Sequence, residues 1–222
     1  MGHWLDFIGV TVLLMNLMAL SSSRIKSCVR IVAAQGALIG CIPVIKYFPC
    51  VAPVTVIFPL TNIILKGVVF PWLLLRALRA ANIRKEVEPI GGYPFSLLMG
   101  VAIFVLSYWV ISRVSGPGQP ASVLNAAVSF ATFFTGAYII VSRMKAITQV
   151  IGYLMLENGI YLFGLVYLKE QSLLVEMSIL LDIFVAVFVM GIAIFHISRE
   201  FDHIDTEKLS QLKDIMATGQ DL

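Results

Sequence analysis

Long apolar windows follow one another along almost the whole chain, and each is long enough to cross a lipid bilayer. A helix rises about 1.5 Å per residue, so roughly 20 apolar residues span the hydrocarbon core. Soluble domains carry about 25% charged residues, whereas the charged fraction of these 222 residues is 13%. The pattern predicts an all-α, polytopic membrane protein. We expect about seven transmembrane helices, at residues 5–21, 31–47, 51–75, 94–114, 122–142, 146–168 and 172–197.

The basic residues are distributed unevenly over the loops between these windows. Loops on the cytoplasmic side of a membrane protein carry more Lys and Arg than loops on the other side. With seven helices, most of the 16 basic residues fall on one side. The N-terminus is therefore expected to face out and the C-terminus to face the cytoplasm. The majority side holds Arg24, Lys26, Arg30, Arg76, Arg79, Arg84, Lys85, Arg143, Lys145, Arg199, Lys208 and Lys213, and the other side Lys46, Arg113 and Lys169.

The chain divides into three regions on this interpretation. Residues 1–142 form an N-terminal region of five helices, whose first window is a retained helix rather than a signal peptide because Asp6 replaces a basic leader. Residues 143–197 form a C-terminal helix pair, in which Gly152 and Gly159 are expected to permit close helix contact. Residues 198–222 form a polar cytoplasmic tail, either a short amphipathic helix or a loosely ordered segment.

Three ionisable residues lie near the middle of predicted membrane helices. Glu157 is about 16 Å into its window and Asp182 about 15 Å into the next. Because these two helices would run antiparallel, the two acids are expected at one depth. Lys66 lies near the centre of the third window. A charge at the membrane centre costs at least ~2.5–3.5 kcal/mol on insertion scales, so it requires a partner, water or a function.

Polar residues that share helix faces with these charges could complete a hydrated line of exchangeable groups. Residues four apart lie on one face of a helix. By this spacing the supporting residues are Gln149, Tyr153 and Tyr161 beside Glu157, Asn62 beside Lys66, and Ser178 and, nearer the cytoplasm, His196 beside Asp182.

Structural alternatives stay open for each of these groups. Glu157 and Lys66 could form a static ion pair, and Asp182 could only hydrogen-bond a neighbouring helix. His196 could lie at the membrane interface, and the two tyrosines could serve packing first.

The sequence contains no motif for redox or hydrolytic chemistry. It lacks a phosphate-binding loop, a dinucleotide fingerprint, a His-Glu-x-x-His motif and a Cys-x-x-Cys motif. We therefore expect no catalytic residue, metal site or cofactor in this chain, and no nucleic-acid binding.

Residues 143–213 resemble the hydrogenase-4 component E family. The resemblance rests on the segment from Gln149 through Glu157-Asn-Gly, the segment from Leu174 through Asp182 to Met190, and the segment 204–213; residues 61–71 also look familiar. Subunits of this family belong to membrane-bound group 4 NiFe hydrogenases, formate hydrogenlyases and related energy-converting complexes. The last three helices, beginning with 122–142, are in turn similar to the K subunit of complex I and the C subunit of multisubunit Na⁺/H⁺ antiporters.

The resemblance implies a site and a set of partners. The small subunits place two helix-borne carboxylates on a proton path; Glu157 matches the first, and Asp182 sits where the second, a Glu in the K subunit, would be. Implied partners are antiporter-like membrane subunits, a membrane anchor subunit with a region like a quinone site, and peripheral hydrogenase and Fe–S subunits. These peripheral subunits would hold the NiFe centre and the Fe–S clusters, and the complex would lie in a prokaryotic cytoplasmic (inner) membrane.

From these observations we expect a non-catalytic membrane subunit of an oxidoreductase complex. Glu157, Asp182 and Lys66 would pass protons, or respond to Na⁺, when redox turnover changes the interface between subunits. One alternative is a stand-alone small transporter whose midplane site is built from the same three residues. The other alternative is a purely structural assembly subunit whose acids only hold helices together.

Overall fold

The computed structural model describes residues 3–47, 60–80, 91–114, 120–143, 145–167, 187 and 191. Residues 60–64 are helical and continue directly into η1. The described ranges contain helices and short connections but no strand, so the predicted all-α class is confirmed. The elements are α1 (His3–Ser21), α2 (Ile25–Tyr47), η1 (Leu65–Val69), α4 (Phe70–Ala80), α5 (Gly92–Val114), α6 (Pro120–Ser142) and α7 (Ala146–Tyr167).

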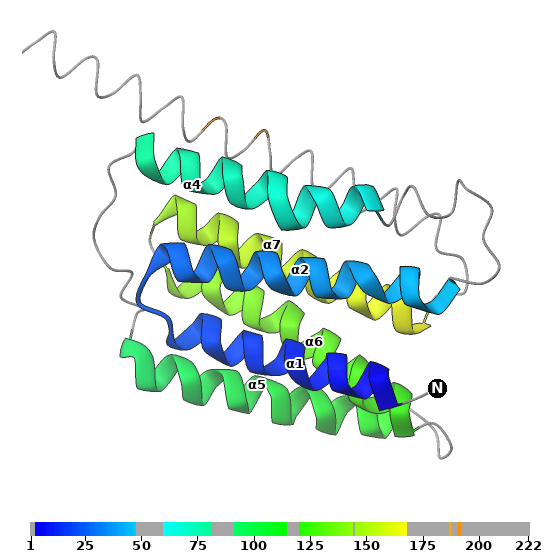
Figure 1. Ribbon diagram of the computed structural model, residues 1–222. Coiled ribbons are helices and arrows are strands. Elements are labelled where there is room, and N and C mark those ends of the chain that lie inside the picture. Colours follow the sequence, from blue (N-terminus) through cyan, green and yellow to red (C-terminus); the bar gives the residue numbers. More distant parts are fainter. Residues whose placement is uncertain are drawn as a thin grey trace, which may run out of the picture.

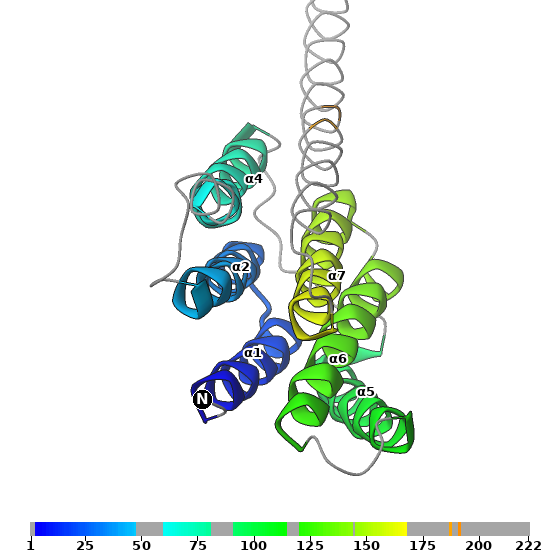
Figure 2. The same ribbon diagram turned by 90° about the vertical axis from the view of Figure 1, so that its right-hand side faces the viewer.

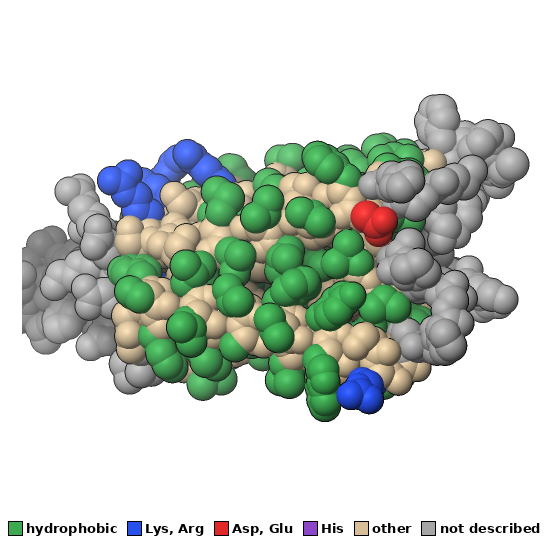
Figure 3. Space-filling model, turned by 90° about the horizontal axis from the view of Figure 1, so that it is seen from below, with side chains coloured by type: hydrophobic (Ala, Val, Ile, Leu, Met, Phe, Trp, Pro, Cys, Tyr) green, Lys and Arg blue, Asp and Glu red, His purple; other side chains and the backbone are tan. Residues whose placement is uncertain are grey.

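Six helices in the described part of the chain are long and apolar enough to cross a membrane, with Leu60–Arg79 forming one of them. Figure 3 shows hydrophobic side chains over most of one face, with the Lys and Arg side chains of that face near its ends. These features confirm the polytopic class. Of the predicted seventh helix at 172–197, the structure describes only residues 187 and 191, both helical. Ser178, Asp182, His196 and the tail 198–222 lie outside the described residues. The predicted sidedness stays a prediction.

Two helix boundaries differ from the predicted windows because hydropathy falls at charged residues where the helix continues. α2 begins at Ile25 rather than near residue 31, and the amides of Ser27 and Cys28 donate to the Arg24 carbonyl. The third span continues to Ala80 rather than ending near residue 75. Its basic side chains lie on the exposed side of α4 while the apolar residues beside them are buried, so the helix tolerates charge in its last turns.

The helices lie side by side along a common direction (Figure 1). Viewed end-on, α4, α2 and α1 form one row and α7, α6 and α5 form a second (Figure 2). α7 packs against α2 and α6, while α5 packs against α1 and α6. The functional side chains described below come from the helical residues before η1, from η1 and from α7, and the backbone of α2 lies beside them where the two rows meet.

Glycines bring the backbones of α6 and α7 into direct contact. A Cβ atom on Gly136 would overlap the backbone at Leu156, and one on Gly159 would overlap the backbone at Phe133. On Gly152 it would lie 2.9 Å from the Gly136 carbonyl oxygen. The predicted close contact at Gly152 and Gly159 is therefore confirmed, and Gly136 supplies the matching gap on α6.

We expect Gly159→Leu to prevent stable packing of α6 against α7. The added side chain would overlap the Phe133 backbone, which cannot move away as a flexible side chain would. The amount of folded protein in mild detergent, measured by size-exclusion chromatography, should fall severely. Gly191→Leu is the control, because a Cβ there meets no atom of the described residues within 4 Å. A normal yield of Gly159→Leu would show that the two helices do not need this contact.

A buried hydrogen-bonded network connects three helices near the middle of the bundle. The Asn16 side chain donates to Thr132 Oγ1 at 2.8 Å, and Gln35 Nε2 donates to Asn16 Oδ1 at 2.8 Å. All three side chains are essentially inaccessible to solvent. Such bonds align helices in a lipid environment, where apolar contacts alone give little directionality. The network fixes α1, α2 and α6 at the depth where α2 also meets the ion pair.

Candidate functional site

A buried ion pair joins residues that are far apart in the sequence. Lys66 Nζ lies 2.7 Å from Glu157 Oε1, and the two side chains are only 6% and 2% exposed. Lys66 is on η1 and Glu157 is near the middle of α7. The equal depth expected from the sequence is therefore accompanied by direct contact. A buried charge of either sign requires such a partner.

The Lys66 ammonium group also faces two neighbours of Glu157 on α7. Its Nζ donates to Asn158 Oδ1 over 3.5 Å, a long hydrogen bond, and lies 5.3 Å from the centre of the Tyr161 ring. Aromatic faces attract cations at this distance. Asn158 Nδ2 donates in turn to the Val32 carbonyl oxygen at 3.4 Å. The lysine is thus held by an acid, an amide and a ring from a single helix, which is itself tied to α2.

Gly36 on α2 leaves the space through which the lysine side chain passes. A Cβ atom at this position would lie 3.1 Å from Lys66 Cβ and 3.3 Å from Asn158 Oδ1. Both distances are tighter than ordinary contacts. A side chain at residue 36 would therefore push the lysine stem or the amide out of place.

The backbone that carries Lys66 has an unusual local structure. Leu65–Val69 is a π-helix, in which the Phe70 amide donates to the Leu65 carbonyl. Pro71, which follows directly, has no N–H to donate, so one carbonyl about a turn earlier lacks its helical donor. Short π segments are rare and occur frequently at functional sites. Lys66 thus sits on an irregular segment, whereas Glu157 sits on a regular helix.

Asn62, about one turn before Lys66, and Tyr161, about one turn after Glu157, also lie beside the ion pair. They are 1% and 3% exposed, respectively. Asn62 faces the Tyr161 hydroxyl, although neither amide atom of Asn62 makes a hydrogen bond of good geometry in the described structure. Buried polar atoms without a hydrogen-bond partner in the protein are the usual binding positions of internal water.

The remaining predicted support residues lie farther away. Gln149 is eight residues before Glu157, about 12 Å along the helix, and its Nε2 donates to the Arg143 carbonyl oxygen at 3.2 Å. Tyr153 packs against the largest apolar cluster. The structure therefore brings Lys66, Glu157, Tyr161 and Asn62 together and places Gln149 near the end of the helix.

Sequence reasoning missed Asn158 and Gly36. The search for residues four apart excludes Asn158, because it follows Glu157 directly. Yet Lys66 lies between the directions of these two adjacent side chains and contacts both. Gly36 gave no signal because a glycine in an apolar window looks like any small packing residue.

The fold and the site together define a helical membrane protein with a lysine–glutamate pair buried at its centre. Residues 124–214 match the family model of NADH-ubiquinone/plastoquinone oxidoreductase chain 4L. The matched segment contains Glu157 and Asn158, whereas Lys66 lies before it.

Similar sequences occur in several bacteria. Hydrogenase-4 component E of Escherichia coli (strain K12) is 28% identical over 142 residues, which cover 63% of this chain and 66% of that protein. Hydrogenase-4 component E of Shigella flexneri matches to the same extent. The uncharacterized protein Rv0085 of Mycobacterium tuberculosis is 28% identical over 211 residues, 94% of this chain and 96% of that protein. No solved structure matches significantly. These matches confirm the predicted resemblance to hydrogenase-4 component E.

Proposed function

We propose that this chain is a non-catalytic membrane subunit of a complex I-related, energy-converting oxidoreductase complex of the group 4 NiFe hydrogenase type. Support comes from the matches to chain 4L and to hydrogenase-4 component E, together with the membrane-spanning helices. In this role Lys66 and Glu157 translocate protons, or respond to Na⁺, in step with redox chemistry in partner subunits. Asp182 is the proposed second carboxylate of the path.

The observation that carries this proposal is the buried ion pair at 2.7 Å. Buried ion pairs contribute little to stability, because well-packed apolar residues of similar volume serve as well or better. Stability therefore gives no reason to place a lysine and a glutamate opposite each other within a bundle of apolar helices. A role in moving charge gives such a reason, since intramembrane acids and bases are typical of proton paths.

We propose that movement of the lysine drives proton transfer at the acid. Lys66 Nζ is carried by a flexible side chain 2.7 Å from Glu157 Oε1, so a rearrangement of partner subunits can separate the two groups. The carboxyl group of Glu157 would take up a proton while Lys66 is displaced and pass that proton to the next acceptor when Lys66 returns. One proton would move for each cycle of the lysine.

Partner subunits supply the chemistry that this chain lacks. We propose that antiporter-like subunits and an anchor subunit resembling a quinone site contact it in a prokaryotic cytoplasmic membrane. Peripheral subunits would hold the NiFe centre and the Fe–S clusters. The C-terminus would face the cytoplasm, as the basic loops predict.

Purification of the tagged chain in mild detergent tests this assignment. We expect stoichiometric co-purification of other membrane subunits and of peripheral proteins that contain nickel and iron. Vesicles containing the assembly should then translocate protons when supplied with electron donor and acceptor. A chain that purifies alone and binds a solute would instead support the stand-alone transporter and overturn the proposal.

A further inference from the structure

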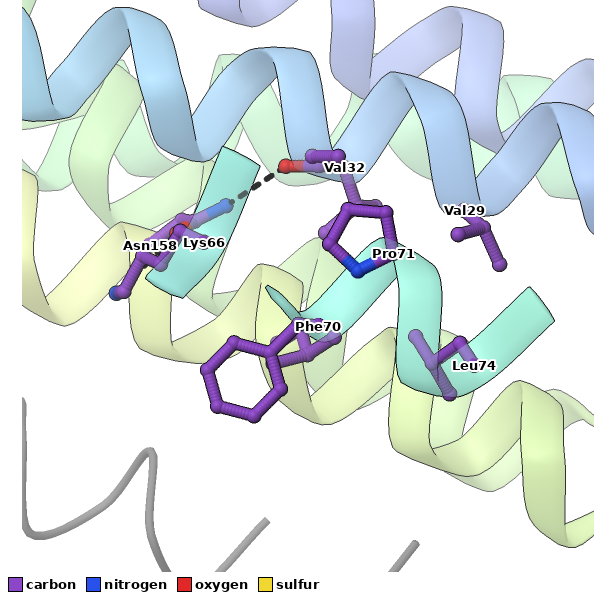
Figure 4. Close-up of a pocket in the computed structure, with 9 residues that line it drawn as sticks. Val29, Val32, Lys66, Phe70, Pro71, Leu74 and Asn158 are labelled. Carbon is purple, nitrogen blue, oxygen red and sulfur yellow. Dashed lines mark hydrogen bonds between the residues drawn. The ribbon is translucent and has the colours of Figure 1, made fainter. Parts of the chain in front are cut away.

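A small cavity begins at the ion pair and extends along one side of Lys66. It lies between α2, the η1–α4 segment and α7. In Figure 4, Lys66 and Asn158 lie at one end of it, and Val29 and Leu74 lie at the other. The lining is apolar apart from Lys66 and Asn158, and consists otherwise of Val29, Val32, Ala33, Phe70, Pro71, Leu74 and Leu154.

The cavity leads from the ion pair toward the end of α4 that carries basic residues. Leu74 is eight residues beyond Lys66, about 12 Å along the helix. Arg76 and Arg79 follow within the next turns and are exposed. Ala77 and Leu78 are buried beyond the cavity and separate it from that end of the bundle. The cavity therefore lies along the direct route from Lys66 to the basic end.

Its size and polar groups suit a single water molecule. The free space is close to the minimum that one water needs. Such a water requires two to four polar partners. Lys66 and Asn158 line the cavity at this end, so the ammonium group and the side-chain amide are its two polar partners. Farther along, Phe70, Leu74 and Leu154 offer no partner for a second water.

The geometry points to a gated water site on this side of the ion pair: one water molecule bound by Lys66 and Asn158, separated from the basic end by a dry barrier of Phe70, Leu74 and Leu154. Narrow apolar passages block conduction because they do not hold water. The ion pair can exchange protons with the basic end only when more water crosses this barrier. Asn62 and Tyr161 lie on the opposite side of the pair. This inference rests on the proposed function.

The leak of protons through the resting complex tests the barrier. We expect Leu74→Asn to raise the passive proton conductance of liposomes containing the whole complex about tenfold, since an amide offers water the missing partner and a tenfold change needs only about 1.4 kcal/mol. A pH-sensitive dye inside the liposomes reports the rate without any redox substrate. Adding Lys66→Met together with Glu157→Gln, which removes both charges of the pair at once, should return the leak to the wild-type rate, because the route passes through the ion pair.

Two further variants keep the test specific. Leu165→Asn places the same amide at a buried leucine in a different apolar cluster, away from the cavity, and should not leak. Ala33→Leu fills the cavity, so it should slow turnover-driven proton translocation several-fold without raising the leak. Ala33→Leu decides the question if Leu74→Asn fails to assemble.

The proposal is overturned if assembled Leu74→Asn is as tight as wild type, if Leu165→Asn leaks equally, if the leak persists when Lys66→Met and Glu157→Gln are added to Leu74→Asn, or if Ala33→Leu translocates at the wild-type rate. These outcomes are separate from the fate of the proposed function, which Glu157→Gln decides. Normal coupling in Glu157→Gln would end the relay itself. Loss of coupling there, combined with a tight Leu74→Asn complex, would end only the gated water site.

Discussion

Replacing Glu157 by Gln is expected to leave the complex assembled while lowering proton translocation per redox turnover at least about 100-fold, the usual scale for loss of a positioned proton-transfer group. Gln has nearly the same shape as Glu, and its amide oxygen can still accept a hydrogen bond from Lys66 Nζ. It cannot take up and release a proton. Packing should therefore survive and proton transfer should not.

The measurement compares redox rate with proton movement in the same membrane vesicles. Asp6→Asn is the matched control, because Asp6 is also an acid in a helix that accepts a side-chain hydrogen bond, from Asn125 at 3.0 Å, but it lies near the end of α1. The number of protons that Asp6→Asn translocates per electron transferred should equal the wild-type value. Wild-type translocation in Glu157→Gln would exclude this residue from the relay.

Replacing Lys66 by Met should have a larger effect on assembly than Glu157→Gln. Met keeps much of the side-chain volume but leaves Glu157 without the cation 2.7 Å away. Removal of one partner from a buried pair typically costs about 3–5 kcal/mol. We therefore expect little assembled complex on native gels, together with a lower unfolding temperature for what remains.

The double variant Lys66→Met with Glu157→Gln distinguishes a relay from a static bridge. It removes both charges at once, so most of the lost assembly should return. Proton translocation should stay absent, because no group remains that can exchange a proton. Translocation by this double variant at the wild-type rate would establish the static ion pair as the correct interpretation.

Much of the fold could be predicted from hydropathy because a membrane imposes a minimum length on every apolar segment. The predicted windows find each described span, and the errors occur at the ends. α2 starts earlier and α4 ends later than expected, in both cases where Lys or Arg residues continue the helix. Long basic side chains reach the interface from within a helix, so the point where hydropathy falls is not the point where the helix stops.

The depth of the site along the helices could be predicted from the sequence, but the rotation of each helix about its own axis could not. Counting residues along two helices places Lys66 and Glu157 at one level, and the structure brings them into contact. The rotation of each helix about its own axis depends on packing with the others, which the sequence does not state. For this reason Asn158 and Gly36 were missed. The π segment also has no sequence signature beyond the nearby Gly67 and Pro71.

The glycine contact between α6 and α7 has a consequence for how a mechanical signal could reach this centre. Backbones that touch at Gly136, Gly152 and Gly159 cannot slide or turn past each other without collision, so the carboxylate is anchored to a rigid pair of helices. The ammonium group, by contrast, is carried by a flexible side chain on an irregular segment followed by α4, which packs mainly against η1 and α2 and shares an apolar cluster with α7. Glu157 is therefore the fixed member of the pair, and Lys66 is the member that can change position. A rearrangement in a neighbouring subunit that displaced α4 would move Lys66 relative to Glu157.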